Sequence, residues 1–207
     1  MLQDDALKAI PLWINGHAFL TVTPIFREVR NPINGVVLRR VPLCGYDEVQ
    51  VAIAAAQAAL GSWAGMPEKA RVFLLSAVGD ALAHYGAHFA ALVSEESGKD
   101  SSLSDIEVDR SVALLRSAAA GNCTGVVAVI GDSTSPLLES LLFAVPALAA
   151  GATVVARPSP EVPSTLFALA ELIGRCGLPD GVFNIVYGDD VAADILRASG
   201  DISAHFP

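Results

Sequence analysis

The sequence predicts an α/β protein with a doubly wound parallel sheet, preceded by a helical and β-hairpin region. Apolar runs that are rich in β-branched residues and flanked by glycine, such as 125–131 and 153–156, are typical of strands buried on both faces. Stretches with helical spacing of apolar residues separate these runs, so strand and helix alternate in the second half of the chain. We therefore expect a single domain over residues 1–207, with strands and helices at 12–120 and a βαβαβ core at 121–207.

The N-terminal region begins with short strands. Segments 12–16 and 27–30 are expected to form a hairpin closed near Thr23-Pro24, and Asn34-Gly35 is a turn before a strand at 36–41. Apolar residues then recur at helical spacing, with Gly86 and Gly98 placed to close two of the helices. The predicted helices are 46–60, 68–85, 87–97 and 104–119.

A strand–helix–strand crossover forms the centre of the predicted core. Helix 136–150 follows the strand at 125–130; Ser135 can cap this helix, and the charge of Glu139 suits its first turn. Pro146 should bend the helix or end its first segment, and the glycine at position 151 can stop it. The predicted elements that follow are strand 153–156, helix 163–176, strand 182–187, helix 190–198 and strand 202–206.

Three segments carry a resemblance to a known family. Residues 146–155 read Pro-Ala-Leu-Ala-Ala-Gly-Ala-Thr-Val-Val, residues 157–159 read Arg-Pro-Ser, and residues 178–188 read Leu-Pro-Asp-Gly-Val-Phe-Asn-Ile-Val-Tyr-Gly. They resemble Pro-Ala-Leu-Ala-x-Gly-Asn-Thr-Val-Val, Lys-Pro-Ser and Leu-Pro-x-Gly-Val-x-Asn-Val-Val-x-Gly of the NAD(P)-dependent aldehyde dehydrogenase superfamily. The resemblance covers residues 12–206 and implies the Rossmann-like cofactor-binding domain of that family.

The resemblance also implies where a dinucleotide would lie, because polar turns follow the first two parallel strands and open α/β sheets bind ligands there. Thr134 stands at the position of the family's oxyanion asparagine, and its hydroxyl cannot present the same amide donor. Asp132 adds a negative charge that would repel pyrophosphate, although residues 132–135 equally fit a plain polar helix start. The implied cofactor-binding residues are Ile130, Gly131, Ser133, Arg157, Ser159 and Pro160.

The turn after the second strand bears on the choice of cofactor. Arg157 keeps a cation where relatives have lysine, whereas Pro160 replaces the carboxylate that relatives use to hold the ribose, with Glu161 one place later. A cation without the competing carboxylate would tolerate a 2′-phosphate, so NADP is favoured over NAD, with binding expected to be weak or lost.

No residue of this chain is predicted to be catalytic. The family's chemistry needs a cysteine nucleophile and a glutamate base, and the resemblance implies that both, with the phosphate loop, come from sequence beyond position 207. Cys176 is expected in the last turn of a helix, whose negative end disfavours a thiolate, and Asp47 disfavours one at Cys44. Cys123 has no cation close in sequence, and His84 with the histidine at 88 lacks the glutamate of a zinc helix, so no metal site is expected.

Composition excludes several kinds of partner. A net charge of −9 argues against nucleic acid and anionic membranes, and the longest uncharged run, 140–156, is shorter than the ~20 residues of a bilayer span. The acidic residues 1–5 lack the basic start of a secretory signal, so we expect a cytoplasmic protein. With 53% hydrophobic and only 17% charged residues, part of the apolar surface is expected to meet a protein partner or a second copy.

Three hypotheses for the function remain open. The chain is part of an oxidoreductase whose catalytic half lies elsewhere, a non-catalytic aldehyde dehydrogenase-like partner subunit or scaffold, or a ligand-free domain with an apolar face. The substitutions at Ser133, Thr134 and Pro160 favour the second for activity. So does the short connection at 121–124, because relatives have a subunit-assembly hairpin there.

Overall fold

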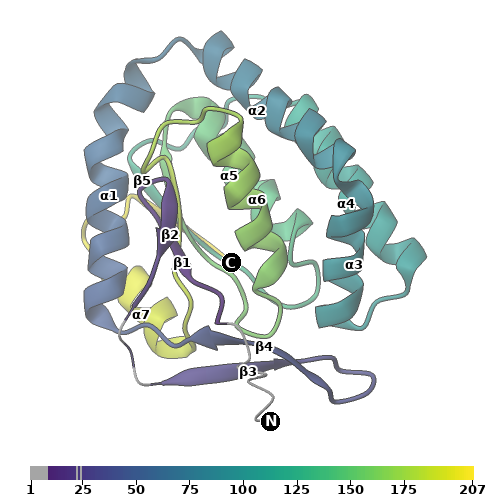
Figure 1. The fold of residues 1–207 in the computed structure, drawn as a ribbon. Helices are drawn as coiled ribbons and strands as arrows, with labels where there is room; N and C mark the ends of the chain where they lie inside the picture. Colours follow the sequence, from purple (N-terminus) through teal and green to yellow (C-terminus); the bar gives the residue numbers. More distant parts are fainter. Residues whose placement is uncertain (1–8, 22, 24) are drawn as a thin grey trace.

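A central sheet carries helices on both faces, and a further layer of helices lies outside those on one face (Figure 1). The computed structural model describes residues 9–21, 23 and 25–207, so Pro24 of the predicted turn and the acidic residues 1–5 lie outside the described residues. The sheet has six strands in the order β2-β1-β7-β6-β5-β8. Their bounds are β1 Leu12–Ile14, β2 His17–Phe19, β5 Val126–Ile130, β6 Thr153–Arg157, β7 Phe183–Ile185 and β8 Ala204–Phe206.

The strands from β5 to β8 are parallel, which confirms the predicted fold class. Every residue of β5 and β6 is buried, because helices cover both faces of these central strands. The two strands pair from Val126 with Thr153 to Ile130 with Arg157. Arg157 is therefore the last residue of β6 and not, as predicted, the first residue of the turn.

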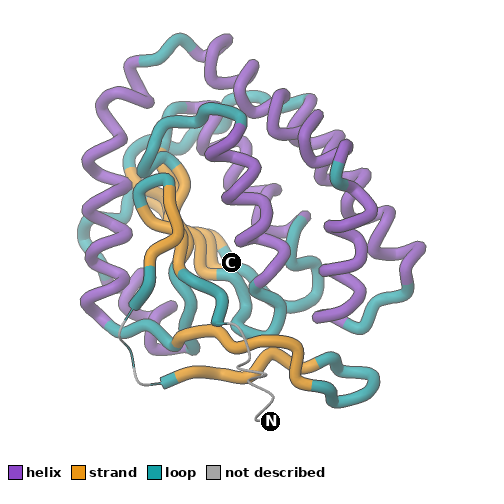
Figure 2. The backbone as a smooth tube through the Cα atoms, viewed as in Figure 1, coloured by secondary structure: helices purple, strands orange, loops and turns teal. Residues whose placement is uncertain are grey.

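The predicted hairpin between segments 12–16 and 27–30 is wrong. β1 turns back at once and pairs with β2, because Asn15 and Gly16 both have positive φ angles, 53° and 80°, as a two-residue hairpin turn requires. β1 also joins the main sheet through Trp13, which pairs antiparallel with Ile185 of β7. β3, Phe26–Arg30, pairs with β4, Val37–Pro42, in a separate two-stranded sheet at the bottom of the view in Figure 2.

Seven helices are formed by the described residues, and they cover the sheet in an uneven way. α1 and α7 contact one face, α5 and α6 contact the other, and α2, α3 and α4 pack on the outside of α5 and α6. Within the described ranges no helix by itself has the length and apolar character of a membrane span; α1 and α2 pass such a test only together, across a bend of 118°. The bounds are α1 Tyr46–Gly65, α2 Glu68–His84, α3 Gly86–Ser97, α4 Ser101–Arg116, α5 Leu138–Ala150, α6 Ser164–Arg175 and α7 Asp190–Ala198.

The start and course of α5 differ from the prediction. The helix begins at Leu138, and the side chain of Ser135 does not cap it, because a carboxylate from α4 takes that place, as described below. Pro146 does not end the helix, which continues to Ala150; its carbonyl accepts a hydrogen bond from the Gly121 amide at 2.9 Å.

Other helix ends were predicted with mixed success. Gly98 and Gly151 end α3 and α5 in the left-handed conformation, with φ angles of 73° and 98°, as predicted. Gly86 instead opens α3, and α4 starts three residues before the predicted position 104, at Ser101.

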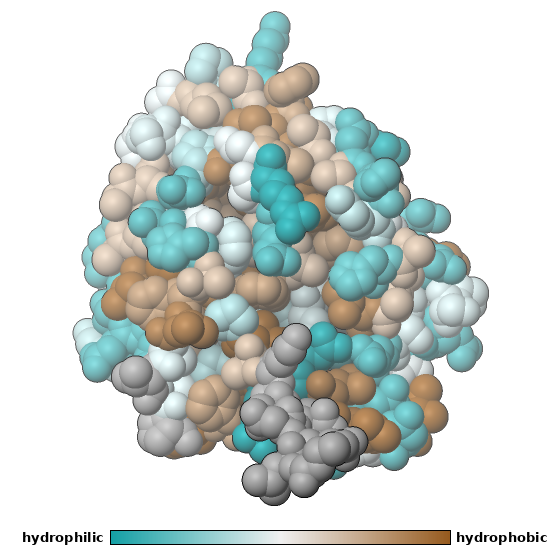
Figure 3. Space-filling model, viewed as in Figure 1, coloured by the Kyte–Doolittle hydropathy of each residue, from teal (hydrophilic) through white to brown (hydrophobic). Residues whose placement is uncertain are grey.

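Exposed apolar residues gather on the two-stranded sheet and its connections. Leu20 is 81% exposed and Ile33 is 75% exposed, and Phe26 of β3 is also exposed. Figure 3 shows hydrophobic surface in the lower part of this face, on both sides of the residues drawn in grey. The core thus buries many of the hydrophobic residues of the chain, but others remain exposed on the surface.

Candidate ligand site

A cavity of about 310 Å³ lies at the carboxyl ends of β5 and β6, beside the start of α7. It brings together most of the predicted cofactor-binding residues, which come from two turns far apart in the sequence. Ile130 is the exception, because it is buried within β5. The residues that line the cavity are Gly131, Asp132, Ser133, Arg157, Ser159, Pro160, Arg27, Glu161, Asp189 and Asp190.

Arg157 is the most unusual residue of this cavity. Its side chain lies at the end of β6 and the residue is only 8% exposed, yet its Nε has no hydrogen-bond acceptor among the described residues. Burial lowers the pKa of Arg157, and the carboxylates of Asp190 and Asp189 oppose that effect. A buried cation without a close partner is unfavourable unless an anion meets it. The arginine therefore places a buried positive charge in the wall of the cavity.

The turn after β5 is held by its own carboxylates. Asp132 accepts a hydrogen bond from the Thr134 amide at 2.7 Å, and the Asp132 amide donates to Glu139 at 3.3 Å. Burial opposes ionisation of Asp132, but hydrogen bonds from Glu139 and Thr134 outweigh it and lower its pKa. Burial and the neighbouring Asp132 carboxylate raise the pKa of Glu139. Thr134 itself is exposed and does not line the cavity.

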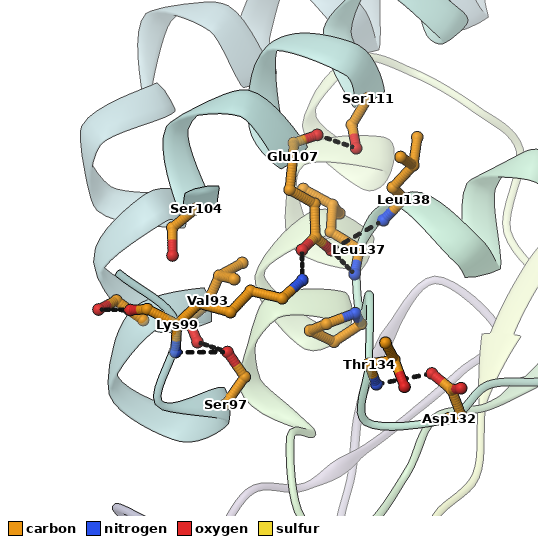
Figure 4. A network of polar contacts seen from close by, with 12 residues as sticks. Val93, Ser97, Lys99, Ser104, Glu107, Ser111, Asp132, Thr134, Leu137 and Leu138 are labelled. Carbon is orange, nitrogen blue, oxygen red and sulfur yellow. Dashed lines mark hydrogen bonds and ion pairs between the residues drawn. The ribbon is translucent and has the colours of Figure 1, made fainter. Parts of the chain in front are cut away.

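Glu107 of α4 caps the start of α5, as Figure 4 shows. Its Oε1 accepts hydrogen bonds from the amides of Leu137 and Leu138 at 2.9 and 3.2 Å, and its Oε2 lies 2.5 Å from Nζ of Lys99. Glu107 is only 4% exposed, so its ion pair with Lys99 is largely buried. The same carboxylate also supplies the acceptor that the first free amides of the helix need. The start of α5, which follows the turn that lines the cavity, is thus held from the outer helical layer.

Glu96 of α3 caps the start of α6. Its carboxylate accepts hydrogen bonds from the Ser164 amide at 3.0 Å and from the Ser164 hydroxyl at 2.5 Å, and it lies 3.1 Å from Nε of Arg39. Burial raises the pKa of Glu96, although Ser164 and the Arg39 cation act in the opposite direction. The sequence analysis predicted neither carboxylate, because each acts on a helix start far away in the chain.

Burial opposes ionisation of two of the three cysteines. Burial raises the pKa of the Cys44 thiol to about 12, although a hydrogen bond from the backbone of Tyr187 acts in the opposite direction. Burial also raises the pKa of Cys176, which is the direction predicted for this thiol. Within the part of the chain that the structure describes, no three His, Cys, Asp or Glu side chains form a group that could hold a metal ion.

Larger hollows lie elsewhere on the molecule. One of about 520 Å³ lies between α3, α6 and β4, and another of about 780 Å³ follows α3. None of the predicted cofactor-binding residues lines either hollow. The cavity at the carboxyl ends of β5 and β6 is smaller, but it is the one that the buried Arg157 lines.

Comparison with known proteins identifies the class of protein that this fold and site define. The family model described as "Aldehyde dehydrogenase family" matches residues 23–123 and 121–204, and the chain belongs to that family. It is 33% identical to 2-hydroxymuconic semialdehyde dehydrogenase of Pseudomonas sp. (strain CF600), over 96% of this chain and 47% of the relative. It is also 33% identical to human 2-aminomuconic semialdehyde dehydrogenase, over 91% of this chain and 43% of that protein.

Solved structures agree with this assignment. Methylmalonate-semialdehyde dehydrogenase from Oceanimonas doudoroffii superposes with a TM-score of 0.90 at 27% identity, covering 96% of this chain and 45% of that one. An NADP-dependent enzyme of E. coli superposes with a TM-score of 0.89 at 28% identity, covering 99% of this chain and 47% of that one. The chain thus spans somewhat less than half the length of the relatives that it matches.

Proposed function

We propose that this chain is a non-catalytic member of the aldehyde dehydrogenase family, which acts as a partner subunit or scaffold and keeps at most weak NAD(P) binding. The state of two of its three thiols carries the proposal. Cys44 is 4% exposed with a pKa of about 12, so at neutral pH it holds almost no thiolate to attack an aldehyde. Cys176 is shifted in the same direction. Thr134 supports the proposal, since a hydroxyl replaces the amide donor that the family's chemistry uses for the oxyanion.

The residues of the cavity fit a dinucleotide only in part. Arg157 and Ser159 offer a cation and a hydroxyl at the end of β6, where relatives are expected to hold the adenosine ribose. A similar structure is described as an NADP-dependent enzyme, which supports NADP as the cofactor to test first. The acidic lining, with Asp132, Asp189 and Asp190, does not suit a pyrophosphate.

The test of the catalytic part is direct. The purified chain is mixed with aliphatic, aromatic and semialdehyde substrates and either NAD⁺ or NADP⁺, and NAD(P)H formation is followed by absorbance. We expect no aldehyde-dependent formation. Turnover that disappears on changing Cys44, Cys123 or Cys176 to serine would overturn the proposal, because it would identify a working nucleophile. Turnover that survives the triple cysteine-to-serine change would also overturn it, by revealing other chemistry.

We further propose that a second polypeptide covers the sheet edge formed by β8 and the neighbouring face of α5. Among the described strands β8 has a partner on one side only, and Leu142 of α5 is 46% exposed. Beside it, Phe143 of α5 stacks on Phe206 of β8 with ring centroids 4.9 Å apart. The partner we expect presents an apolar surface to Leu142 and to the unpaired edge of β8.

Light scattering tests the association. We expect Leu142→Glu to weaken complex formation with a co-expressed second polypeptide, while Val51→Glu, an equally exposed apolar position on α1, leaves it unchanged. If the chain self-associates when no second polypeptide is present, the surface is covered by another copy of this chain and the proposal of a different partner is wrong. A strict monomer at high concentration that binds no apolar dye would contradict the proposal.

A further inference from the structure

A trough on the surface between α3 and α6 is separate from the cavity at the carboxyl ends of β5 and β6. The hollow of about 520 Å³ described above forms one part of it, and a hollow of about 300 Å³ forms the other. Because His88 of α3 and both Ala168 and Glu171 of α6 line each hollow, the two are continuous. We call them together the α3–α6 trough.

Most of the trough is lined by apolar and aromatic side chains. In the smaller hollow Phe89 and Leu172 are buried, and Tyr85 adds an exposed aromatic ring. The two volumes fall within the range of about 300–1,000 Å³ that is usual for small-molecule sites, which combine an apolar lining with a few polar groups. The apolar residues that line the larger hollow are Ala9, Ile10, Pro11, Leu38, Leu92, Phe167 and Ala168.

Two opposite charges face the smaller hollow without meeting each other. Glu171 and Arg175 lie four residues apart on α6, in the order that favours an ion pair along a helix. Both line the hollow instead, and among the described residues neither takes part in an ion pair. Glu171 is half-buried and Arg175 is exposed. A ligand that carries both an ammonium and a carboxylate group could therefore bridge them.

The larger hollow offers no comparable pair of charges. Its arginine, Arg39, is already paired with Glu95 at 2.6 Å and with Glu96 at 3.1 Å. The rest of its lining is mainly apolar. A ligand would therefore place its charged end in the smaller hollow and its apolar part in the larger one.

We propose that the α3–α6 trough binds a zwitterionic α-amino acid with a large apolar side chain. The ammonium group of the ligand donates to Glu171, its carboxylate accepts from Arg175, and its side chain passes Ala168 into the larger hollow. The proposal is independent of catalysis and of nucleotide binding, since no residue that lines the cavity at β5 and β6 also lines the trough.

Calorimetric titration of the purified chain with four ligands tests this chemistry. We expect L-phenylalanine to bind at least about tenfold more tightly than glycine, because only its side chain buries apolar surface. It should bind about fivefold more tightly than 3-phenylpropionate or 2-phenylethylamine, each of which lacks one of the two charged groups. Equal affinity for L-phenylalanine and any of the other three ligands, or no binding of L-phenylalanine at millimolar concentration, would overturn the inference.

Two charge variants assign the two ends of the ligand. Glu171→Gln should weaken L-phenylalanine binding about fivefold without weakening the binding of 3-phenylpropionate, which has no ammonium group. Arg175→Gln should weaken L-phenylalanine binding to a similar extent without weakening the binding of 2-phenylethylamine, which has no carboxylate. A uniform loss for all ligands in either variant would contradict the assigned contacts.

A third variant places the ligand in the trough. Ala168→Trp fills the point where the two hollows join and should abolish the binding of L-phenylalanine and of both analogues. Unchanged binding by this variant, with a native circular dichroism spectrum, would show that the ligand lies elsewhere. If the variant does not fold, the two charge variants still decide the question.

Matched controls change exposed charges of α4 that do not line the trough. Asp109→Asn and Arg110→Gln should each alter the affinity for L-phenylalanine by less than about twofold. If Glu171→Gln and Arg175→Gln weaken binding no more than these controls do, net charge alone explains the effect and the inference is wrong.

Discussion

Removal of the Glu107 carboxylate should destabilise the protein more than any surface change on the same helix. Glu107→Ala leaves the amides of Leu137 and Leu138 without their acceptor and leaves Nζ of Lys99 without the carboxylate that lies 2.5 Å away. Because Glu107 is 4% exposed, water does not readily replace these interactions. Breaking a buried pair from one side costs about 3–5 kcal/mol, which for a chain of this length lowers Tm by about 10 °C.

Urea unfolding followed by far-UV circular dichroism measures this, with stability taken from the midpoint at constant slope. Glu107→Gln should lose less, about 1–2 kcal/mol, because its amide oxygen can still accept from the helix start. Asp109→Ala, an exposed carboxylate on the same helix, is the matched control and should stay within about 0.5 kcal/mol of wild type.

A double-mutant cycle with Lys99→Met isolates the ion pair. The coupling between Glu107→Ala and Lys99→Met should be at least about 1 kcal/mol, since each partner left alone is a buried or half-buried charge. If Glu107→Ala costs no more than the Asp109 control, or if the two changes add within about 0.5 kcal/mol, the reasoning from the buried pair is refuted.

Three further predictions follow from burial and backbone geometry. Burial raises the pKa of Glu96 above its ordinary 4.5, so the native state keeps that proton longer than the unfolded chain. The stability of wild type relative to Glu96→Gln should therefore fall as pH rises from about 4, and a difference that grows with pH would contradict this. With a pKa near 12 against an ordinary 9.0, Cys44 should react with a thiol reagent at pH 8 about 10³-fold more slowly in the native chain than in urea; equal rates would show an open thiol. Gly181 has a φ of +79°, and an added Cβ would lie 2.6 Å from the Ala55 carbonyl oxygen, so Gly181→Ala should cost about 2 kcal/mol or more. Gly200→Ala, where a Cβ meets nothing within 4 Å, is its control in the same denaturation assay; similar losses for both would count against the steric argument.

The parallel core was predictable because its signals are local. Continuous apolar runs bounded by glycine mark β5 and β6, and α7 was predicted at its observed bounds, 190–198, since Asp189 and the apolar spacing after it lie next to each other in the chain. The pairing of β1 with β2 also has a local signal, the Asn15-Gly16 turn, whereas the predicted hairpin rested on a more distant Thr-Pro segment.

The carboxylates that fix the candidate site could not be read from adjacent residues. Glu107 acts on an amide 30 residues away, and Glu96 acts on Ser164, 68 residues away. A weaker signal was present. Glu107 lies on the stripe of α4 that also holds Val108, Ser111 and Leu115 and is buried along its length. A carboxylate on such a stripe needs a partner, although the sequence does not say which one.

The two ends of α5 have a consequence for how the chain folds. Glu107 of α4 holds the start of this helix, and Arg71 of α2 donates from Nε to the Ala149 carbonyl at its end, at 2.9 Å. The same arginine also reaches the carbonyl of Met66, just beyond α1. A carboxylate thus meets the positive end of the helix dipole and a guanidinium meets the negative end, and both come from the N-terminal half of the chain.

Because those end contacts cross the boundary near residue 120, the two halves are expected to fold cooperatively and not as independent units. A fragment that carries only 121–207 would keep its strands in sequence but lose both clamps on its central helix. We expect the intact chain to unfold in one transition by every probe, and separated halves to regain structure only when mixed.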